Sequence, residues 1–147
     1  MLDPTVRRAA ANDAADIELL EREARRALIG QRGGERWLIE HPEVGEAWIE
    51  RFLTADVWVA HIERVVVGYL VAVLGSDRIV RVEQVWVTPE ARELGFGDGM
   101  LNAAIAGAVE HGAEAVEGQA LPGDRHTKNL YERAGIVARL ITTYKRL

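Results

Sequence analysis

Three apolar runs typical of β-strands follow one another in the middle of the chain, and a glycine-rich loop and a helical segment come directly after them. The runs cover residues 57–63, 65–74 and 79–88. Only Glu63 and Arg64 separate the first two, so we expect a hairpin there, although this pair is not a favoured turn dipeptide. The pattern therefore predicts a sheet whose third central strand leads through a loop into a helix.

The segments on either side of this centre add helices and further strands. Asn12 or Asp13 can cap a first helix, whose apolar residues recur at helical spacing. The remaining predicted elements are a strand at 5–9, a loop at 30–34, a helix at 44–53, a helix at 97–111, a strand at 115–121, a helix at 127–134 and a strand at 137–145. The order β-α-α-β-β-β-α-β-α-β predicts a single α/β domain over residues 1–147, with a mixed β-sheet flanked by helices.

Composition excludes several classes of function. The 147 residues contain no cysteine, which excludes disulfides, thiolate metal sites and a cysteine nucleophile. The only serine, Ser76, has no Gly-x-Ser-x-Gly around it, so a serine acyl-enzyme is not expected. The net charge of −5 disfavours nucleic-acid binding. The start of the chain lacks an apolar signal core and no run is long enough for a membrane span, so we expect a cytoplasmic protein without a membrane partner.

The glycine-rich loop is typical of an anion site. Gly95, Gly97 and Gly99 stand at the start of an alanine-rich helix, where unpaired N–H groups and the helix dipole favour a phosphate. A Walker loop needs a Gly-Lys pair, which this chain lacks. A dinucleotide loop needs Gly-x-Gly-x-x-Gly directly after its strand, whereas here Gly-x-Gly-x-Gly begins eight residues after Val87.

A third kind of phosphate loop fits the spacing. Val87, Pro89, Arg92, Gly95 and Gly97, followed by an early leucine in the helix, match a Val-x-Pro-x-x-Arg-x-x-Gly-x-Gly pattern. This run resembles the acetyl-CoA loop of the GNAT family of N-acetyltransferases.

A second stretch, residues 124–136, resembles the family's C-terminal motif. Leu130, Tyr131 and Gly135 match, while Asp124 stands where the family usually has asparagine. The resemblance covers about residues 57–147, and the first 56 residues match it only in layout.

The resemblance implies which residues bind acetyl-CoA as a co-substrate. Backbone N–H groups from about Arg92 to Gly97 would bind the pyrophosphate, and the strand before the loop would bind the pantetheine arm. The N–H group of Val85 would face the thioester carbonyl and stabilise the negative charge that develops there. The cofactor-binding residues implied are Val85, Trp86, Val87, Arg92, Glu93, Leu94, Gly95, Phe96, Gly97, Asp98, Asp124 and Lys128.

The same resemblance implies two catalytic side chains. Tyr131 would protonate the thiolate of the leaving CoA. Glu83 alternates onto the same face of its strand as Val85 and would act as the base. Two alternatives remain: water relays the proton, or Glu83 pairs with Arg81 or Arg139 instead. The four histidines show no metal-ligand spacing, so we expect no metal.

These residues predict an acetyl-CoA-dependent N-acetyltransferase in which a primary amine attacks the thioester directly within a ternary complex. Residues 57–147 would form the acetyl-CoA-binding core and residues 1–56 the acceptor side. The acceptor would be a small-molecule or peptide amine, and a homodimer is possible in this family. The alternative is a non-catalytic acyl-CoA-binding or regulatory module on the same fold.

Overall fold

Five strands form one mixed sheet in the order β1-β2-β3-β4-β5 in the computed structural model, which describes residues 5–147. The first four strands are antiparallel, and β5 is parallel to β4. The predicted domain begins at residue 1, but residues 1–4 lie outside the described residues. They include the first part of the segment in which the sequence lacks an apolar signal core. The strands are β1 (Thr5–Arg8), β2 (Asp56–Ile62), β3 (Val65–Leu74), β4 (Ile79–Val87) and β5 (Ala115–Gly118).

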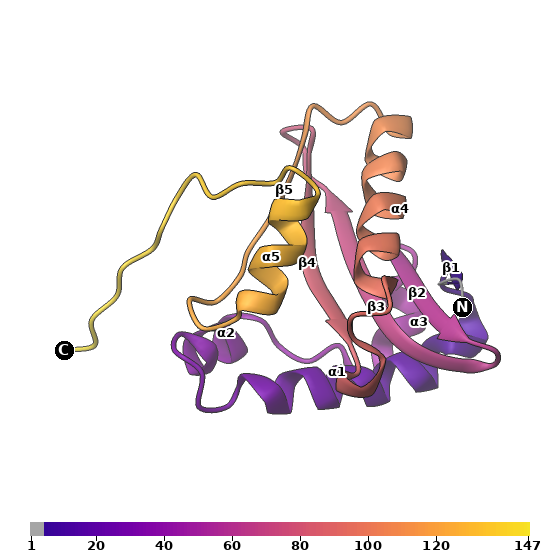
Figure 1. Ribbon diagram of the computed structural model, residues 1–147, viewed down its shortest axis with the longest axis horizontal. Helices are drawn as coiled ribbons and strands as arrows, with labels where there is room; N and C mark the ends of the chain where they lie inside the picture. Colours follow the sequence, from indigo (N-terminus) through magenta and orange to yellow (C-terminus); the bar gives the residue numbers. More distant parts are fainter. Residues whose placement is uncertain (1–4) are drawn as a thin grey trace.

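Helices cover both faces of this sheet (Figure 1). One core packs α4 and α5 against the sheet, with Met100 and Leu101 fully buried. The other packs α1 and α3 against the opposite face around Ile17 and Trp48. The helices are α1 (Ala14–Leu28), α2 (Gly34–Glu40), α3 (Trp48–Arg51), α4 (Phe96–Glu110) and α5 (Arg125–Arg133), with short 3₁₀ turns at Ala11–Asp13, Gly45–Ala47 and Pro89–Ala91.

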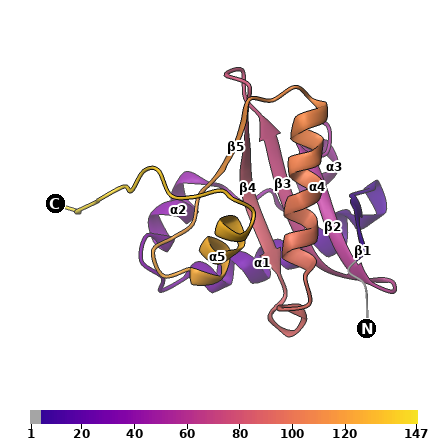
Figure 2. The ribbon, with the colours of Figure 1, turned by 45° about the horizontal axis from the view of Figure 1, so that its top comes forward.

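Helix α4 connects the two parallel strands and lies along the sheet (Figure 2), and α5 contributes to the same core. Strand β3 is buried on both faces, because helices pack on each side of it. This explains why its sequence is continuously apolar rather than alternating. The single α/β domain architecture with a mixed sheet confirms the predicted fold class.

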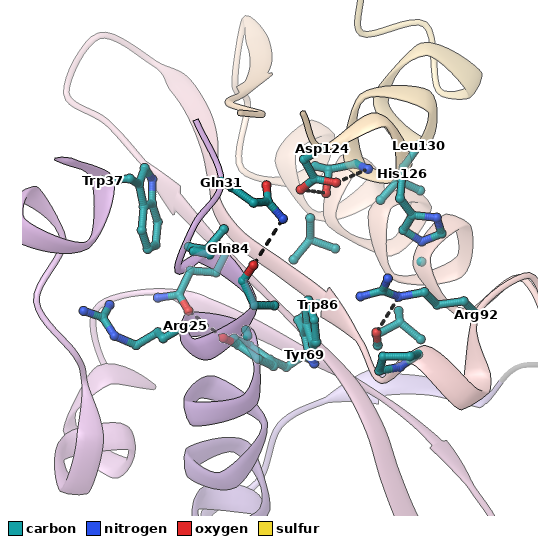
Figure 3. Close-up of a pocket in the computed structure, with 18 residues that line it drawn as sticks. Arg25, Gln31, Trp37, Tyr69, Gln84, Trp86, Arg92, Asp124, His126 and Leu130 are labelled. Atoms are coloured by element: carbon teal, nitrogen blue, oxygen red, sulfur yellow. Dashed lines mark hydrogen bonds between the residues drawn. The ribbon is translucent and has the colours of Figure 1, made fainter. Parts of the chain in front are cut away.

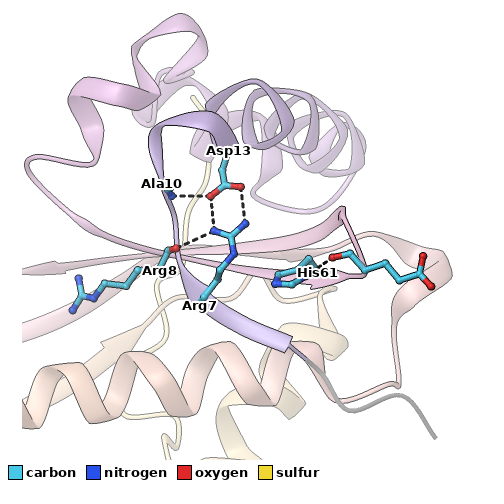
Figure 4. A network of polar contacts seen from close by, with 6 residues as sticks. Arg7, Arg8, Ala10, Asp13 and His61 are labelled. Carbon is cyan, nitrogen blue, oxygen red and sulfur yellow. Dashed lines mark hydrogen bonds and ion pairs between the residues drawn. The ribbon is translucent and has the colours of Figure 1, made fainter.

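The start of α1 is held by an ion pair with β1 (Figure 4). The Asp13 carboxylate accepts two bonds from the Arg7 guanidinium, at 2.7 and 2.9 Å, and a third from the Ala10 N–H at 2.7 Å. These charged donors hold the pKa of Asp13 below its usual value although the side chain is buried. Asp13, one of the two predicted candidates, is the N-cap residue of α1, but its side chain makes no capping bond to the helix and binds the preceding Ala10 N–H and Arg7 instead.

A buried carboxylate explains why the predicted helix at 44–53 is broken. Glu21 of α1 is fully buried and accepts from the N–H groups of Val44 and Gly45, at 3.0 and 2.9 Å, and from Trp48 Nε1 at 3.3 Å. These bonds fix a 3₁₀ turn at Gly45–Ala47, and α3 itself covers only Trp48–Arg51. Apolar spacing gives no sign of such a long-range bond.

One further prediction of secondary structure is wrong, and one helix was not predicted. The strand expected at 137–145 is not formed: residues 137–147 pair with no strand and are exposed. Apolar spacing indicates which faces a strand would have, but a strand also needs a neighbouring edge. The chain from Gly34 to Glu40, left unassigned after the predicted loop, forms α2.

Within the described part of the chain, no helix is both long enough and apolar enough to cross a lipid bilayer.

Candidate active site

A cavity of about 270 Å³ lies where α1, α2, β4 and the start of α5 meet (Figure 3). Figure 3 shows side chains from these separate parts of the chain pointing into one space. The cavity lies between the end of β4 with its glycine loop and helices α1 and α2, which belong to the region predicted to form the acceptor side. The lining residues are Ala24, Arg25, Ala27, Leu28, Gln31, Trp37, Tyr69, Gln84, Val85, Trp86, Val87, Pro89, Arg92, Gly97, Asp124, His126, Thr127 and Leu130.

The outer edge of β4 is open beside this cavity. Strand β5 pairs with β4 only from Ile79 to Val82, so the edge of the following residues has no partner strand. The Thr88 N–H donates to Val67 O of β3 at 2.8 Å. Because successive peptide groups of a strand point to opposite edges, the N–H groups of Val85 and Val87 face the open edge. An extended ligand can therefore hydrogen-bond to the main chain here as an additional strand would.

The loop before α4 presents a second set of free main-chain groups. Gly95 caps the helix with φ 89°, and Glu93 has φ 66°, a region that glycine tolerates and other residues rarely adopt. Within residues 5–147, the N–H groups of residues 93–98 donate to no protein acceptor. With the positive end of the dipole of a 15-residue helix behind them, these groups form an anion site.

Arg92 lies over the open edge rather than in free solvent. Its Nε donates to Val87 O at 3.0 Å, and its guanidinium lies 4.6 Å from the centre of the Trp86 ring. The Arg92 side chain, which the sequence assigned to cofactor binding, therefore donates to a main-chain carbonyl group beside the loop. A ligand bonded along β4 would compete with Arg92 for the Val87 carbonyl.

A β-bulge changes the predicted position of Glu83. The register places Val71 opposite Gln84 and Ala72 opposite Val82, so Glu83 is the extra residue. Glu83 is exposed, pairs with Arg51 at 2.5 Å and is not among the lining residues. The expectation that Glu83 shares a face with Val85 by simple alternation is therefore wrong, as are its predicted alternative partners.

Gln84 lies in the cavity instead of Glu83. Its Oε1 accepts from the Tyr69 hydroxyl at 2.7 Å. Burial raises the pKa of Tyr69, as does the charge of Glu21, so its hydroxyl remains a donor to Gln84.

Helix α5 brings Asp124 and Tyr131 to the site. Asp124 caps the helix, accepting from Thr127 N at 3.1 Å and Thr127 Oγ1 at 2.7 Å, as expected for a residue replacing asparagine there. Lys128, predicted to help bind the cofactor, is exposed and does not line the cavity.

Tyr131 is buried behind the cavity rather than in its lining. Its ring fills the space beside Gly118 at the end of β5, where a Cβ atom would lie 2.6 Å from the hydroxyl. Among the described residues that hydroxyl has no hydrogen-bond partner. Burial, followed by the charge of Asp124, raises the pKa of Tyr131, so the group stays protonated and able to donate.

Side chains from α1 and α2 complete the cavity, and sequence reasoning did not identify them. Arg25 donates to His41 O at 2.7 Å and Leu38 O at 3.3 Å, which ties the two helices together. Trp37 stacks on His41 with ring centres 4.3 Å apart. Two lining atoms, Gln31 Oε1 and Trp86 Nε1, are buried without a partner within the described chain. Only the helical spacing of α1 could have pointed to this region.

No group of three or more acidic, histidine or cysteine side chains within residues 5–147 is placed to hold a metal ion.

Comparisons with known proteins identify the family. The family model described as the acetyltransferase (GNAT) family matches residues 16–136, so the chain belongs to this family. This confirms the resemblance seen in the glycine loop, and it supports acetyl transfer as the class of activity. No curated protein sequence matches the chain significantly.

Solved structures share the whole fold at low sequence identity. The tetramutant of the BH1408 protein from Bacillus halodurans is 18% identical with a TM-score of 0.80, covering 97% of this chain and 99% of that one. The aminoglycoside acetyltransferase AAC(6')-Iy, in complex with a CoA bisubstrate analogue, is 15% identical with a TM-score of 0.69 over 99% and 100%. The ribosomal-protein-alanine N-acetyltransferase of Brucella melitensis is 16% identical with a TM-score of 0.73 over 98% and 99%.

Proposed function

We propose that this protein is an acetyl-CoA-dependent N-acetyltransferase that transfers the acetyl group directly to a primary amine. The observation that carries the proposal is the open edge of β4 beside the free N–H groups of residues 93–98. The open edge of β4 suits an extended, amide-containing arm, and the free N–H groups of residues 93–98 suit a pyrophosphate. The residues present therefore fit CoA, with the family as independent support.

The pyrophosphate would bind the N–H groups of residues 93–98, a set shifted by one residue from the sequence prediction. Arg92 N already donates to Pro89 O at 3.3 Å, so it is not available. The Arg92 side chain would leave the Val87 carbonyl when the pantetheine amides bond to the edge of β4. Gly97 leaves the approach to the loop open, because a side chain there would project between Leu130 and the bound group.

The reaction would proceed in one transfer. The neutral amine attacks the thioester carbonyl carbon, its C–N bond forms and the C–S bond breaks. The Val85 N–H would stabilise the negative charge on the carbonyl oxygen. Tyr131 would give its proton to the departing sulfur, a role consistent with its unpaired hydroxyl and its raised pKa.

The proton lost by the amine would leave through water rather than to Glu83. Glu83 is held by Arg51 on the exposed side of the bulge. Asp124 is the one carboxylate in the described cavity lining, and its oxygens accept from Thr127 while keeping lone pairs for water. A water relay ending near Asp124 therefore replaces direct abstraction by Glu83.

The acceptor would be a small-molecule or peptide amine bound between Trp37 and Gln84. The structural relatives include enzymes that carry both kinds of acceptor in their names, an aminoglycoside and a ribosomal-protein alanine. We further propose that the protein acts in the cytoplasm, without nucleic acid, membrane or metal. The net charge of −5 supports the proposal that nucleic acid is not a partner.

A test combines binding and turnover. Calorimetric titration with acetyl-CoA should show saturable binding, and release of CoA thiol should depend on an amine drawn from a panel of aminoglycosides, amino acids and peptide N-termini. No binding would reject the proposal. Binding without turnover on any amine would favour the non-catalytic acyl-CoA-binding module, for which the position of Tyr131 outside the lining is the supporting observation.

A further inference from the structure

The side of the cavity formed by α1 and α2 carries a positive charge. Figure 3 shows Arg25, Trp37 and Gln84 towards one end of the cavity, while Asp124 and His126 lie towards the other. Arg25 is the one charged side chain that α1 and α2 contribute to the described lining. An amine substrate that also carries a negative group would therefore meet a complementary charge on this side.

The Arg25 guanidinium is held in place but not neutralised. It donates to the main-chain oxygens of His41 and Leu38, at 2.7 and 3.3 Å, and forms no ion pair within residues 5–147. Glu21, one turn earlier on α1, is fully buried and accepts from three N–H groups of residues 44–48. Because a guanidinium has more N–H groups than two carbonyls use, Arg25 can also donate to a ligand in the cavity.

The Gln84 amide is oriented so that its nitrogen is the free end. Its Oε1 accepts from the Tyr69 hydroxyl at 2.7 Å, and burial raises the pKa of Tyr69, which keeps that hydroxyl a donor. Gln84 Nε2 forms no hydrogen bond within the described chain. Arg25 and Gln84 therefore both present N–H donors to the cavity, an arrangement that suits a carboxylate.

The surroundings of these donors are apolar. The Trp37 ring stacks on His41 with ring centres 4.3 Å apart, which limits its movement. The other side chains that α1 contributes to the lining are Ala24, Ala27 and Leu28. A ligand bound to the donors would therefore place an apolar group, rather than further polar groups, against this side.

Hydrogen-bond acceptors for an amine lie elsewhere in the lining. Gln31 Nε2 donates to Ala27 O at 3.2 Å, while Gln31 Oε1 is buried and has no partner among the described residues. The Asp124 carboxylate also lines the cavity. A molecule with its carboxylate at Arg25 can therefore direct its amine towards these acceptors and the open edge of β4.

We propose that the amine substrate is an apolar amino acid, whose carboxylate binds Arg25 and Gln84 Nε2 and whose side group lies against Trp37. This inference rests on the proposed function, since it names the amine that the same site would acetylate. A polycationic amine such as an aminoglycoside would place ammonium groups against Arg25, so the site would select against it.

Binding to the CoA complex tests the inference without turnover, because CoA has no acetyl group to transfer. Calorimetry compares phenylalanine, leucine and methionine with their amides on protein saturated with CoA. At least one amino acid should bind about 10- to 100-fold more tightly than its amide, since only the amino acid has a charged group for Arg25. No binding of any amino acid, equal affinities for each pair, or tighter binding of an aminoglycoside would overturn the inference.

Two variants locate the carboxylate. Gln84→Glu keeps an oxygen for the Tyr69 hydroxyl but replaces the N–H donors with a negative oxygen, so it should weaken amino-acid binding by about 10-fold or more and leave the amide unaffected. Arg25→Gln should also remove the preference, although it loses the bonds to His41 and Leu38 as well. Arg26→Gln, at an exposed arginine of the same helix, is the matched control and should keep the preference. A preference that survives both changes would overturn the inference.

Acetyl-CoA binding and release of CoA thiol report the proposed function separately. Transfer to amines with no preference for a carboxylate would overturn the amino-acid inference alone. Selective binding of amino acids without transfer to any amine would reject the transferase and support the carboxylate site.

Discussion

The two sides of the cavity are built in different ways. The loop at residues 93–98 offers free main-chain N–H groups, whereas the side formed by α1 and α2 offers side chains such as Arg25 and Trp37. A main-chain site needs glycine at fixed short spacings, and those spacings are visible in the sequence. A side-chain site is assembled from residues distant in sequence and leaves no local pattern. In the proposed function, the first side would bind the ligand common to the family, and the second would select the amine acceptor.

The largest expected effect tests the main-chain side. Gly97→Trp should weaken acetyl-CoA binding by at least about 100-fold, roughly 2.7 kcal/mol, because the indole would fill the space between Leu130 and the ligand. Gly123→Trp is a matched control, since nothing lies within 4 Å of that position. Calorimetry measures both affinities, and circular dichroism checks that both variants fold. Equal affinities would remove the loop from the site.

The next effect concerns Tyr131, which is buried behind the cavity rather than on either of its two sides. Tyr131→Phe should lower kcat by about 10²–10⁴-fold with little change in acetyl-CoA affinity, because only the transferred proton is lost. Tyr144→Phe, in the exposed tail, should retain the wild-type rate. The raised pKa of Tyr131 means that its hydroxyl stays protonated through and beyond the usual tyrosine value of about 10. A fall in rate between pH 8 and 9 would therefore report another group, and unchanged kcat in the Phe variant would reject the acid role.

A smaller effect should separate the two sides kinetically. Trp37→Ala should raise KM for the amine by about 10–100-fold while KM for acetyl-CoA stays within about twofold, since it removes one apolar contact on the α1–α2 side. Ile39→Ala removes an exposed side chain from the same helix and controls for loss of α2. A parallel rise in both KM values would show that the two sides do not act independently.

The sequence predicts the parts of the fold that depend on local or regular patterns. The central strands, the helix after the loop and the glycine loop itself appear close to their expected bounds, because alternation and glycine spacing are short-range signals. The tail strand failed since pairing depends on a neighbour that the pattern does not contain. The break at Val44 failed because it depends on Glu21, which is 23 residues away.

The site shows the same division. The edge of β4 at Val85 and Val87 is unpaired, and the motif points to these residues because it encodes main-chain geometry; ligand binding there stays a prediction. The face on which Glu83 lies was not predictable. The extra residue of a bulge shifts the alternation of side chains, so residues before it no longer share a face with residues an even number of positions after it. Gln84, Trp37 and Arg25 had no local signal at all.

The smallest expected effect decides whether the proton of the amine goes to Glu83 or to a water relay that ends near Asp124. Glu83→Gln removes a charge from an exposed pair with Arg51, a contact worth about 0–1 kcal/mol in stability. Because the bulge directs Glu83 away from the cavity, kcat should stay within about threefold of wild type, and the acid limb of the pH profile should not move. Asp124→Asn is the contrasting variant, which keeps an oxygen acceptor for Thr127 but removes the carboxylate that the relay would use. A loss of about 10²-fold or more in the Glu83 variant, with Asp124→Asn unaffected, would return the base to the bulge and contradict the relay.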